Sequence, residues 1–167
     1  MPFYLRAINR TRWSSSPRPT WLLKNEIPAQ ALADFVPRPA ENLSLWYIED
    51  DRLNVDRVAA AIASARTKLD KLDYATFSID IIKQLDLKVV QSPGTTPDAT
   101  ANTQWHWELI ELSANKANLL VHELYPTIQK ARLMPDVVER LIREGIRLDQ
   151  LRTKSIPDKL LNDLDIK

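Results

Sequence analysis

Glycine and cysteine are almost absent from this chain, and this limits how it can fold and which reactions it can carry out. The 167 residues include two glycines, Gly94 and Gly145, and no cysteine. Disulfides are therefore excluded, and the fold must be stabilised by burying apolar side chains. Chains of about 150 residues bury roughly 70% of their unfolded surface, and 44% of these residues are hydrophobic. We expect a single globular domain with a core of its own.

The same absences exclude several classes of active site. Phosphate-cradling loops need several glycines. Thiolate nucleophiles need cysteine. A zinc site without cysteine needs more histidines than the two in this chain, His106 and His122. No serine lies in the glycine-flanked turn that presents a nucleophile. We therefore assign no catalytic residue, no metal and no cofactor, and we recognise no known family across the whole chain.

The net charge of +1 conceals a separation of charge along the chain. Residues 1–24 contain five basic residues and no acidic one, whereas residues 41–86 contain nine acidic and six basic residues. Either the two regions attract each other within the fold, or the basic segment forms a surface for an anionic partner. The start of the chain lacks the apolar run of a signal peptide, and no run is long enough to span a membrane. We expect a cytoplasmic protein.

Hydrophobic periodicity predicts strands and one strong helix in the first half of the chain. Strands are expected near Phe3–Ile8, Thr20–Leu23 and Leu43–Ile48, with a short helix over Ala29–Phe35 and a longer one from Asn54 or Asp56 to about Leu69. Residues 74–91 allow two readings. The first is a strand over Thr76–Ile79, a helical turn over Asp80–Leu85 and a strand over Leu87–Gln91, and the second is a single helix through Ser78–Leu87.

The second half is predicted to be helical after a long polar loop over Ser92–Thr103. The longest helix is expected from about Gln104 to Tyr125, where Pro126 ends it. Pro135 then opens a helix that runs to Glu144, with Gly145 as a left-handed cap, and short helices follow over Leu148–Arg152 and Asp158–Asp163. This order favours an α+β fold, with a small, mostly antiparallel sheet in the N-terminal half and a helical C-terminal portion. We place the α+β domain at 1–126 and a helical tail, packed on it, at 127–167.

The N-terminal segment is the best candidate for a binding surface because it interleaves arginines with tryptophans. Arginine recognises anions through a planar fork, and tryptophan and arginine also dominate protein interfaces. The candidate partner-binding residues are Arg6, Arg10, Arg12, Trp13, Arg18 and Trp21. Three readings are open: aromatic side chains in the core beneath solvated arginines, a protein interface, or a surface for single-stranded nucleic acid with stacked bases.

A second candidate is a polar stripe on the predicted long helix. Its members are Glu108, Glu111, Asn115, Asn118 and His122, which fall on one side of a helix. They form either a solvated face or a polar groove in which His122 acts as an acid or base. His106 and His122 lie about 160° apart on such a helix, so they cannot share a metal.

The carboxylates of Glu49, Asp50 and Asp51 follow a predicted strand. They are read either as a strand terminator before a helix cap or as ligands of a metal-dependent hydrolase. Together these patterns predict a non-catalytic interaction protein with a protein partner, of the accessory, antitoxin or immunity type. Single-stranded nucleic-acid binding and metal-dependent hydrolysis are the alternatives.

Overall fold

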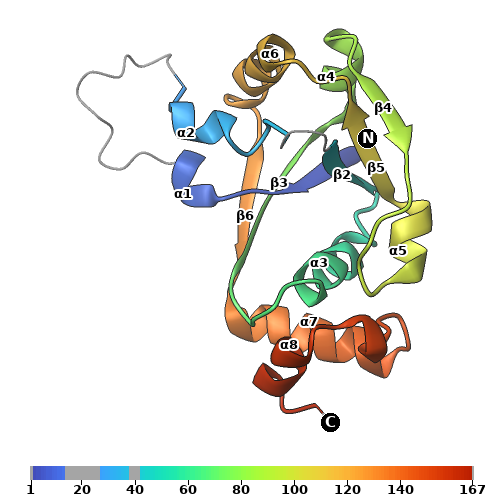
Figure 1. The fold of residues 1–167 in the computed structure, drawn as a ribbon. Coiled ribbons are helices and arrows are strands. Elements are labelled where there is room, and N and C mark those ends of the chain that lie inside the picture. Colours follow the sequence, from blue (N-terminus) through green and yellow to red (C-terminus); the bar gives the residue numbers. More distant parts are fainter. Residues whose placement is uncertain (1, 14–26, 38–41, 167) are drawn as a thin grey trace.

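A computed structural model describes residues 2–13, 27–37 and 42–166, and its centre is a six-stranded antiparallel sheet (Figure 1). The strands lie in the order β4-β5-β2-β1-β3-β6. Their bounds are β1 Phe3–Ala7, β2 Leu43–Ile48, β3 Leu72–Ser78, β4 Lys88–Gln91, β5 His106–Ile110 and β6 Gln129–Leu133. The predicted α+β class is confirmed. The predicted confinement of the sheet to the N-terminal half is wrong, because β5 and β6 come from the second half of the chain.

The first strand lies in the middle of the sheet because it is apolar on both faces. Tyr4 is opposite Tyr47 of β2 and Phe77 of β3, and these three residues share one face. Leu5 points to the other face and is fully buried. Alternate side chains of a strand point to opposite faces, so β1 contributes to the core on both sides.

Helices cover both faces of this sheet (Figure 1). One face packs against α1 Arg10–Trp13, α2 Ala29–Leu32, α4 Ile79–Gln84 and α6 Ala114–Leu124. The opposite face packs against α3 Val55–Ser64 and α5 Ala99–Gln104, and α3 is covered in turn by α7 Pro135–Arg147, the short turn η1 Thr153–Ser155 and α8 Asp158–Asp163. No helix in the described ranges has the length and apolarity needed to cross a membrane.

The helix α3 fits between the sheet and α7 because it is rich in alanine. Val58 and Ala61 face the sheet, whereas Ala59, Ala60 and Ala63 face α7. Small side chains allow close packing on both sides. The helix ends at Ser64 and is shorter than the prediction to Leu69.

Of the two readings of residues 74–91, the strand–helix–strand reading is confirmed and the single helix is wrong. The strand β3 ends at Ser78, whose hydroxyl accepts a hydrogen bond from the Asp80 amide and caps α4. The strand β4 then begins at Lys88. The predicted strand over Thr20–Leu23 lies outside the described residues.

The predicted helix from Gln104 to Tyr125 is wrong, because this segment forms β5 and then α6. Along β5, His106 and Leu109 are buried, and their odd spacing places them on opposite faces of the sheet. The chain turns at Glu111, which adopts a φ of 54°. The Ser113 hydroxyl then accepts from the Lys116 amide and starts the new helix. Apolar spacing over this segment fits a helix, but the polar turn divides it.

The predicted loop over Ser92–Thr103 is shorter than expected, because α5 begins at Ala99. The rest of the segment is anchored by Asp98, which is fully buried. Its carboxylate caps α5 through the Ala101 amide at 2.9 Å and pairs with the Arg57 guanidinium at 2.6 and 3.0 Å. An Asn102 side-chain oxygen accepts from the Thr96 amide. These contacts hold residues 92–98 against α5 and α3.

Gly145 is not the left-handed cap that the sequence predicts. It lies inside α7, which continues to Arg147, and neither glycine has a positive φ. A Cβ at this position would lie 2.8 Å from Leu151 Cδ1 and 2.9 Å from Leu151 Cγ. Glycine is therefore needed at this position, because the chain after α7 folds back and places Leu151 against the helix. The short helix predicted over Leu148–Arg152 is absent, whereas the helix over Asp158–Asp163 is confirmed as α8.

We predict that Gly145→Ala lowers the free energy of unfolding, although alanine favours helix by about 1 kcal/mol. Overpacking against Leu151 costs about 1–3 kcal/mol, and the net loss should be about 1 kcal/mol. In a Leu151→Ala background the same substitution should stabilise the protein. Urea denaturation of the four variants of this cycle measures the coupling, and additive effects would contradict the assigned contact.

Candidate functional site

The N-terminal segment is held in place by one buried carboxylate, that of Asp34, which follows α2. Its oxygens accept hydrogen bonds from the Asn9 amide at 3.0 Å and from Trp13 Nε1 at 2.8 Å. Arg12 Nη1 lies 2.9 Å from the other carboxylate oxygen. These three donors fix α1 against α2, because a buried carboxylate without partners is costly.

Arg6 brings a second guanidinium to the same place from the central strand. Arg6 Nε donates to the Asp34 carbonyl at 2.6 Å, Nη1 donates to the Ser44 carbonyl at 2.8 Å, and the guanidinium lies 5.6 Å from the centre of the Phe35 ring. Burial lowers the pKa of Arg6 to about 10, and the Asp34 carboxylate opposes that shift. Arg6 is therefore charged at neutral pH, and its side-chain hydrogen bonds are to neutral carbonyl groups.

Arg6 and Arg12 open onto a polar cavity of about 540 Å³ between α2 and the start of β2. Its described lining is Arg6, Arg12, Ala33, Asp34, Val36, Pro37, Asn42, Leu43 and Ser44. In this lining, two guanidiniums face one carboxylate. The described part of the cavity therefore has a positive charge that suits an anionic ligand group.

The positive charge continues around α1 to β6. Asp73 of β3 is buried and accepts both Arg132 Nε at 2.6 Å and Arg132 Nη2 at 2.9 Å, together with the Arg10 amide at 3.1 Å. Lys130, two residues before Arg132, lies 6.0 Å from the Trp13 ring centre and 5.5 Å from that of Tyr125. Burial lowers the pKa of Lys130, and so does the nearby charge of Arg10.

We name this surface the basic corner. Its cationic side chains are those of Arg6, Arg10, Arg12, Lys130 and Arg132, and its described carboxylates are those of Asp34 and Asp73. Cations thus outnumber carboxylates in the described part of this surface. Lys130 has no ion pair with any described residue.

The structure separates the predicted partner-binding residues by their exposure. Trp13 is 2% exposed and belongs to the core, stacked on Tyr125 at 6.0 Å. Arg6 is half-buried, whereas the Arg12 side chain is 41% exposed. Arg18 and Trp21 lie outside the described residues. The structure brings four of the predicted residues together: Arg6, Arg10, Arg12 and Trp13. Of these, Trp13 is buried beneath the surface.

The polar stripe is not one face of a helix, which corrects the prediction. Glu108 lies on β5 and accepts a hydrogen bond from Asn42 Nδ2 at 2.9 Å. Glu111 lies in the following turn and pairs with Lys88 of β4 at 2.6 Å. Asn115, Asn118 and His122 are exposed on α6. The five residues therefore do not converge on one groove.

The acidic cluster after β2 shapes a turn. Glu49 Oε1 accepts from Trp105 Nε1 at 3.1 Å, and Asp51 accepts from the Leu53 amide at 3.1 Å. Asn54, next to the start of α3, bridges the turn through its side chain to the Glu49 amide and the Tyr47 carbonyl. Within the described ranges, no three histidine, aspartate or glutamate side chains are grouped to hold a metal ion.

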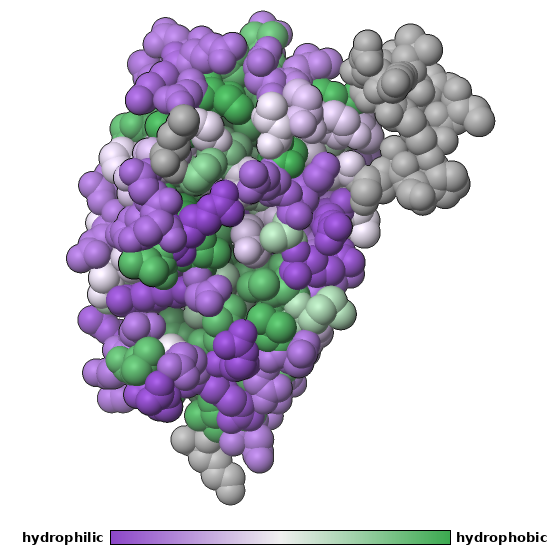
Figure 2. Space-filling model, turned by 180° about the vertical axis from the view of Figure 1, so that it is seen from behind, coloured by the Kyte–Doolittle hydropathy of each residue, from purple (hydrophilic) through white to green (hydrophobic). Residues whose placement is uncertain are grey.

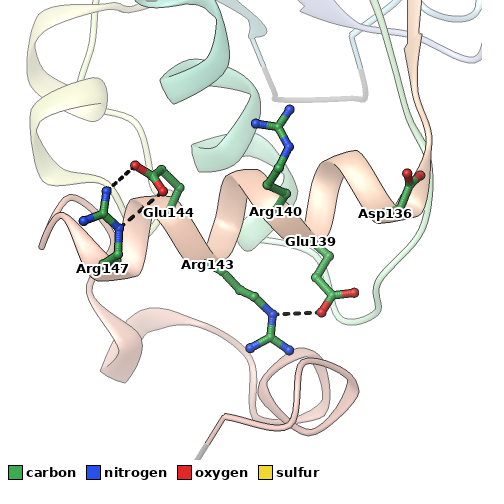
Figure 3. Close-up of a pocket in the computed structure, with 6 residues that line it drawn as sticks. All are labelled: Asp136, Glu139, Arg140, Arg143, Glu144 and Arg147. Atoms are coloured by element: carbon green, nitrogen blue, oxygen red, sulfur yellow. Dashed lines mark hydrogen bonds and ion pairs between the residues drawn. The ribbon is translucent and has the colours of Figure 1, made fainter.

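A second hollow of about 330 Å³ lies along the outer side of α7 (Figure 3). Its charged side chains pair along the helix, Glu139 with Arg143 at 2.8 Å and Glu144 with Arg147. Arg140 makes no ion pair with a described residue. Surface pairs of this kind contribute little to stability. This hollow therefore provides a matched control region for the basic corner.

Sequence reasoning missed Asp34, Asp73 and Lys130. An acidic residue inside the apolar run of β3 is a signal for a buried ion pair, and it points to Asp73. Asp34 sits in an ordinary helical segment and Lys130 in a segment read as a helical tail, so neither residue has a local signal. Both are placed at the basic corner by contacts with distant parts of the chain.

No model of a protein family matches this chain, and no curated protein or solved structure is significantly similar to it. Function is therefore inferred from the chemistry of the site.

We predict that Asp34→Asn lowers the free energy of unfolding by about 1–3 kcal/mol, because the amide cannot accept from every donor that the carboxylate satisfies. Hydrogen exchange at the Asn9 amide should also become faster. Glu123→Gln makes the same chemical change at an exposed position of α6 and should alter neither quantity. Equal stability of the two variants would refute the role given to Asp34.

We predict that the Asp73–Arg132 pair makes the fold sensitive to acid. The hydrogen bond from Arg132 lowers the pKa of Asp73 below its ordinary value of 3.8, although burial acts in the opposite direction. A carboxylate with a lowered folded-state pKa stabilises the protein above its unfolded pKa and loses this contribution as the pH falls through the folded pKa. In urea denaturation below about pH 4, the wild type should lose stability more steeply than Asp73→Asn. Parallel pH profiles would contradict this assignment.

Proposed function

We propose that this protein is a non-catalytic binding protein whose basic corner docks an acidic region of a partner protein. The observation that carries the proposal is the pair of guanidiniums, Arg6 and Arg12, that face one carboxylate at a polar cavity of about 540 Å³. A carboxylate of the partner would supply the second negative charge. Arginine pairs with carboxylates through two parallel hydrogen bonds, which gives direction as well as attraction.

The burial of the aromatic side chains supports a protein partner over single-stranded nucleic acid. Base stacking needs an exposed aromatic face, but Tyr4 is 5% and Trp13 2% exposed. Their rings pack on other aromatic residues of the core instead.

The distribution of exposed apolar side chains supports recognition by charge. Among the described residues, the large exposed hydrophobic side chains come from different elements and loops: Val36, Leu53, Val90, Leu119, Met134 and Leu148. On the face seen in Figure 2, hydrophobic residues lie in several groups bordered by hydrophilic ones. A large obligate interface would need a broader apolar area.

The experiment compares Arg12→Gln with Arg140→Gln as tagged proteins purified from the source cells after nuclease treatment. Each variant removes one positive charge, Arg12 from the basic corner and Arg140 from α7. We expect Arg12→Gln to recover a nuclease-resistant partner with about tenfold lower affinity, mainly at low salt, and Arg140→Gln to behave as wild type. Mass spectrometry at several salt concentrations measures recovery.

Two outcomes would overturn the proposal. The first is equal recovery of the partner by Arg12→Gln and the wild type. The second is nucleic acid that co-purifies in a parallel preparation without nuclease and is lost when nuclease is added. On single strands, binding would also show a log–log salt slope of about −0.7 per neutralised phosphate.

A further inference from the structure

The strand β6 is an edge strand, and its register shows which of its backbone groups point outward. The Ile8 amide donates to the Asp73 carbonyl at 3.1 Å, so Asp73 and Ala75 direct their backbone groups to β1. Hydrogen bonding alternates along an antiparallel strand. Tyr74 therefore bonds with Ala131 of β6, and the backbone groups of Lys130 and Arg132 point away from the sheet.

This outer side is open in the described part of the structure. No described residue outside the sheet donates to or accepts from the backbone of Lys130 or Arg132. Lysine on an edge strand commonly blocks the addition of another strand. Here the Lys130 ammonium lies over Trp13 and Tyr125 on the α1 face instead.

The opposite face of the same edge has a groove of about 320 Å³. It is lined by Arg52, Val55, Tyr74, Thr76, Gln129, Lys130 and Ala131. Arg52 Nη2 donates to Gln129 Oε1 at 3.1 Å, and its guanidinium lies 4.7 Å from the Phe3 ring centre. Arg52 makes no ion pair with a described residue. Each face of this edge thus has one cation without a described carboxylate partner. Lys130 is the cation on the α1 face, and Arg52 is the cation on the groove face.

The other edge of the sheet differs from this one in the pairing of its cation. The cation of β4, Lys88, is paired with Glu111 at 2.6 Å. The Gln91 side chain donates to the Thr103 carbonyl at 2.8 Å and ties β4 to α5. A cation without an ion pair to a described residue therefore distinguishes β6 from β4.

We propose that an extended acidic segment of a partner protein pairs with β6 as an additional strand. Successive side chains of the added strand point to opposite faces. Its apolar residues would enter the groove beside Tyr74 and Ala131, and its carboxylates would lie beside Lys130. The proposal rests on the proposed function, because it names the segment that the basic corner recognises.

The test uses a synthetic peptide of about ten residues in which glutamate and valine alternate. We expect bound peptide to slow hydrogen exchange at the Lys130 and Arg132 amides. Exchange at Gln129 and Ala131, which already bond to β3, should change little. A lysine–valine peptide of the same pattern should not bind.

Two substitutions separate charge from backbone pairing. Lys130→Ala removes the charge and should weaken peptide binding, more at low salt than at high salt. Lys130→Pro also removes the outward amide, and proline is tolerated where that amide faces solvent. We expect Lys130→Pro to bind at least about fivefold more weakly than Lys130→Ala.

A peptide-side control avoids any effect of these substitutions on folding. Methylating alternate backbone nitrogens blocks one edge of the peptide strand at unchanged charge. Two such peptides are compared, one methylated at the odd positions and one at the even positions. One of these two methylated series should lose binding and the other should keep it.

Strand addition is overturned if the peptide does not bind at millimolar concentration, or binds without protecting Lys130 and Arg132. It is also overturned if both methylated series bind equally, or if the two amides are already protected by a second copy in a self-associated protein. If Arg12→Gln loses the cellular partner while Lys130→Pro keeps the peptide affinity of Lys130→Ala, recognition of an acidic partner stands and strand addition fails.

Discussion

The pairing of β1 with both of its neighbours is the interaction on which the rest of the structure depends. This strand of five residues joins β2 and its neighbours to β3 and β6, so neither half of the sheet is complete without it. It also gives Tyr4 to one core and Leu5 to the other. Because Arg6 belongs to the same strand, its guanidinium is fixed by the sheet and does not depend on the conformation of a surface loop.

Charge compensation then determines what the basic segment can do. Asp34 and Asp73 each accept hydrogen bonds from the N-terminal segment, one from the α2 side and one from β3. The ion pair of the basic segment is with Asp34, which precedes the acidic region 41–86, whereas Asp73 of that region binds the Arg10 backbone amide. The compensation is incomplete in the described residues, since only Arg12 of the two cavity guanidiniums pairs with the Asp34 carboxylate, and Lys130 rests on aromatic rings. The proposed recognition would use the same cations that hold the N-terminal segment in the fold.

Sequence patterns identified the elements whose signals are local. The strands β1 and β2, the helix α8 and the division of residues 74–91 follow from alternation, apolar spacing and capping by Ser78. The predictions for the second half of the chain were wrong where tertiary contacts outweigh the local sequence pattern. The residues of β5 and α6 read as one helix because the turn at Glu111 contains no glycine or proline. Gly145 read as a cap, although its role is to leave room for Leu151. For the site, sequence indicated the arginines but not their distant carboxylates.

The chain order of the sheet bears on synthesis as well as on structure. The first strand made is central, its two neighbours follow about 40 and 70 residues later, and the last strand, β6, begins at residue 129. Contacts between residues so far apart in sequence slow folding, because the loops between them must be closed first. On the ribosome, β3 keeps an unpaired edge until β6 has left the exit tunnel. Until residues 129–133 have emerged, this edge is open to pairing with a strand of another chain.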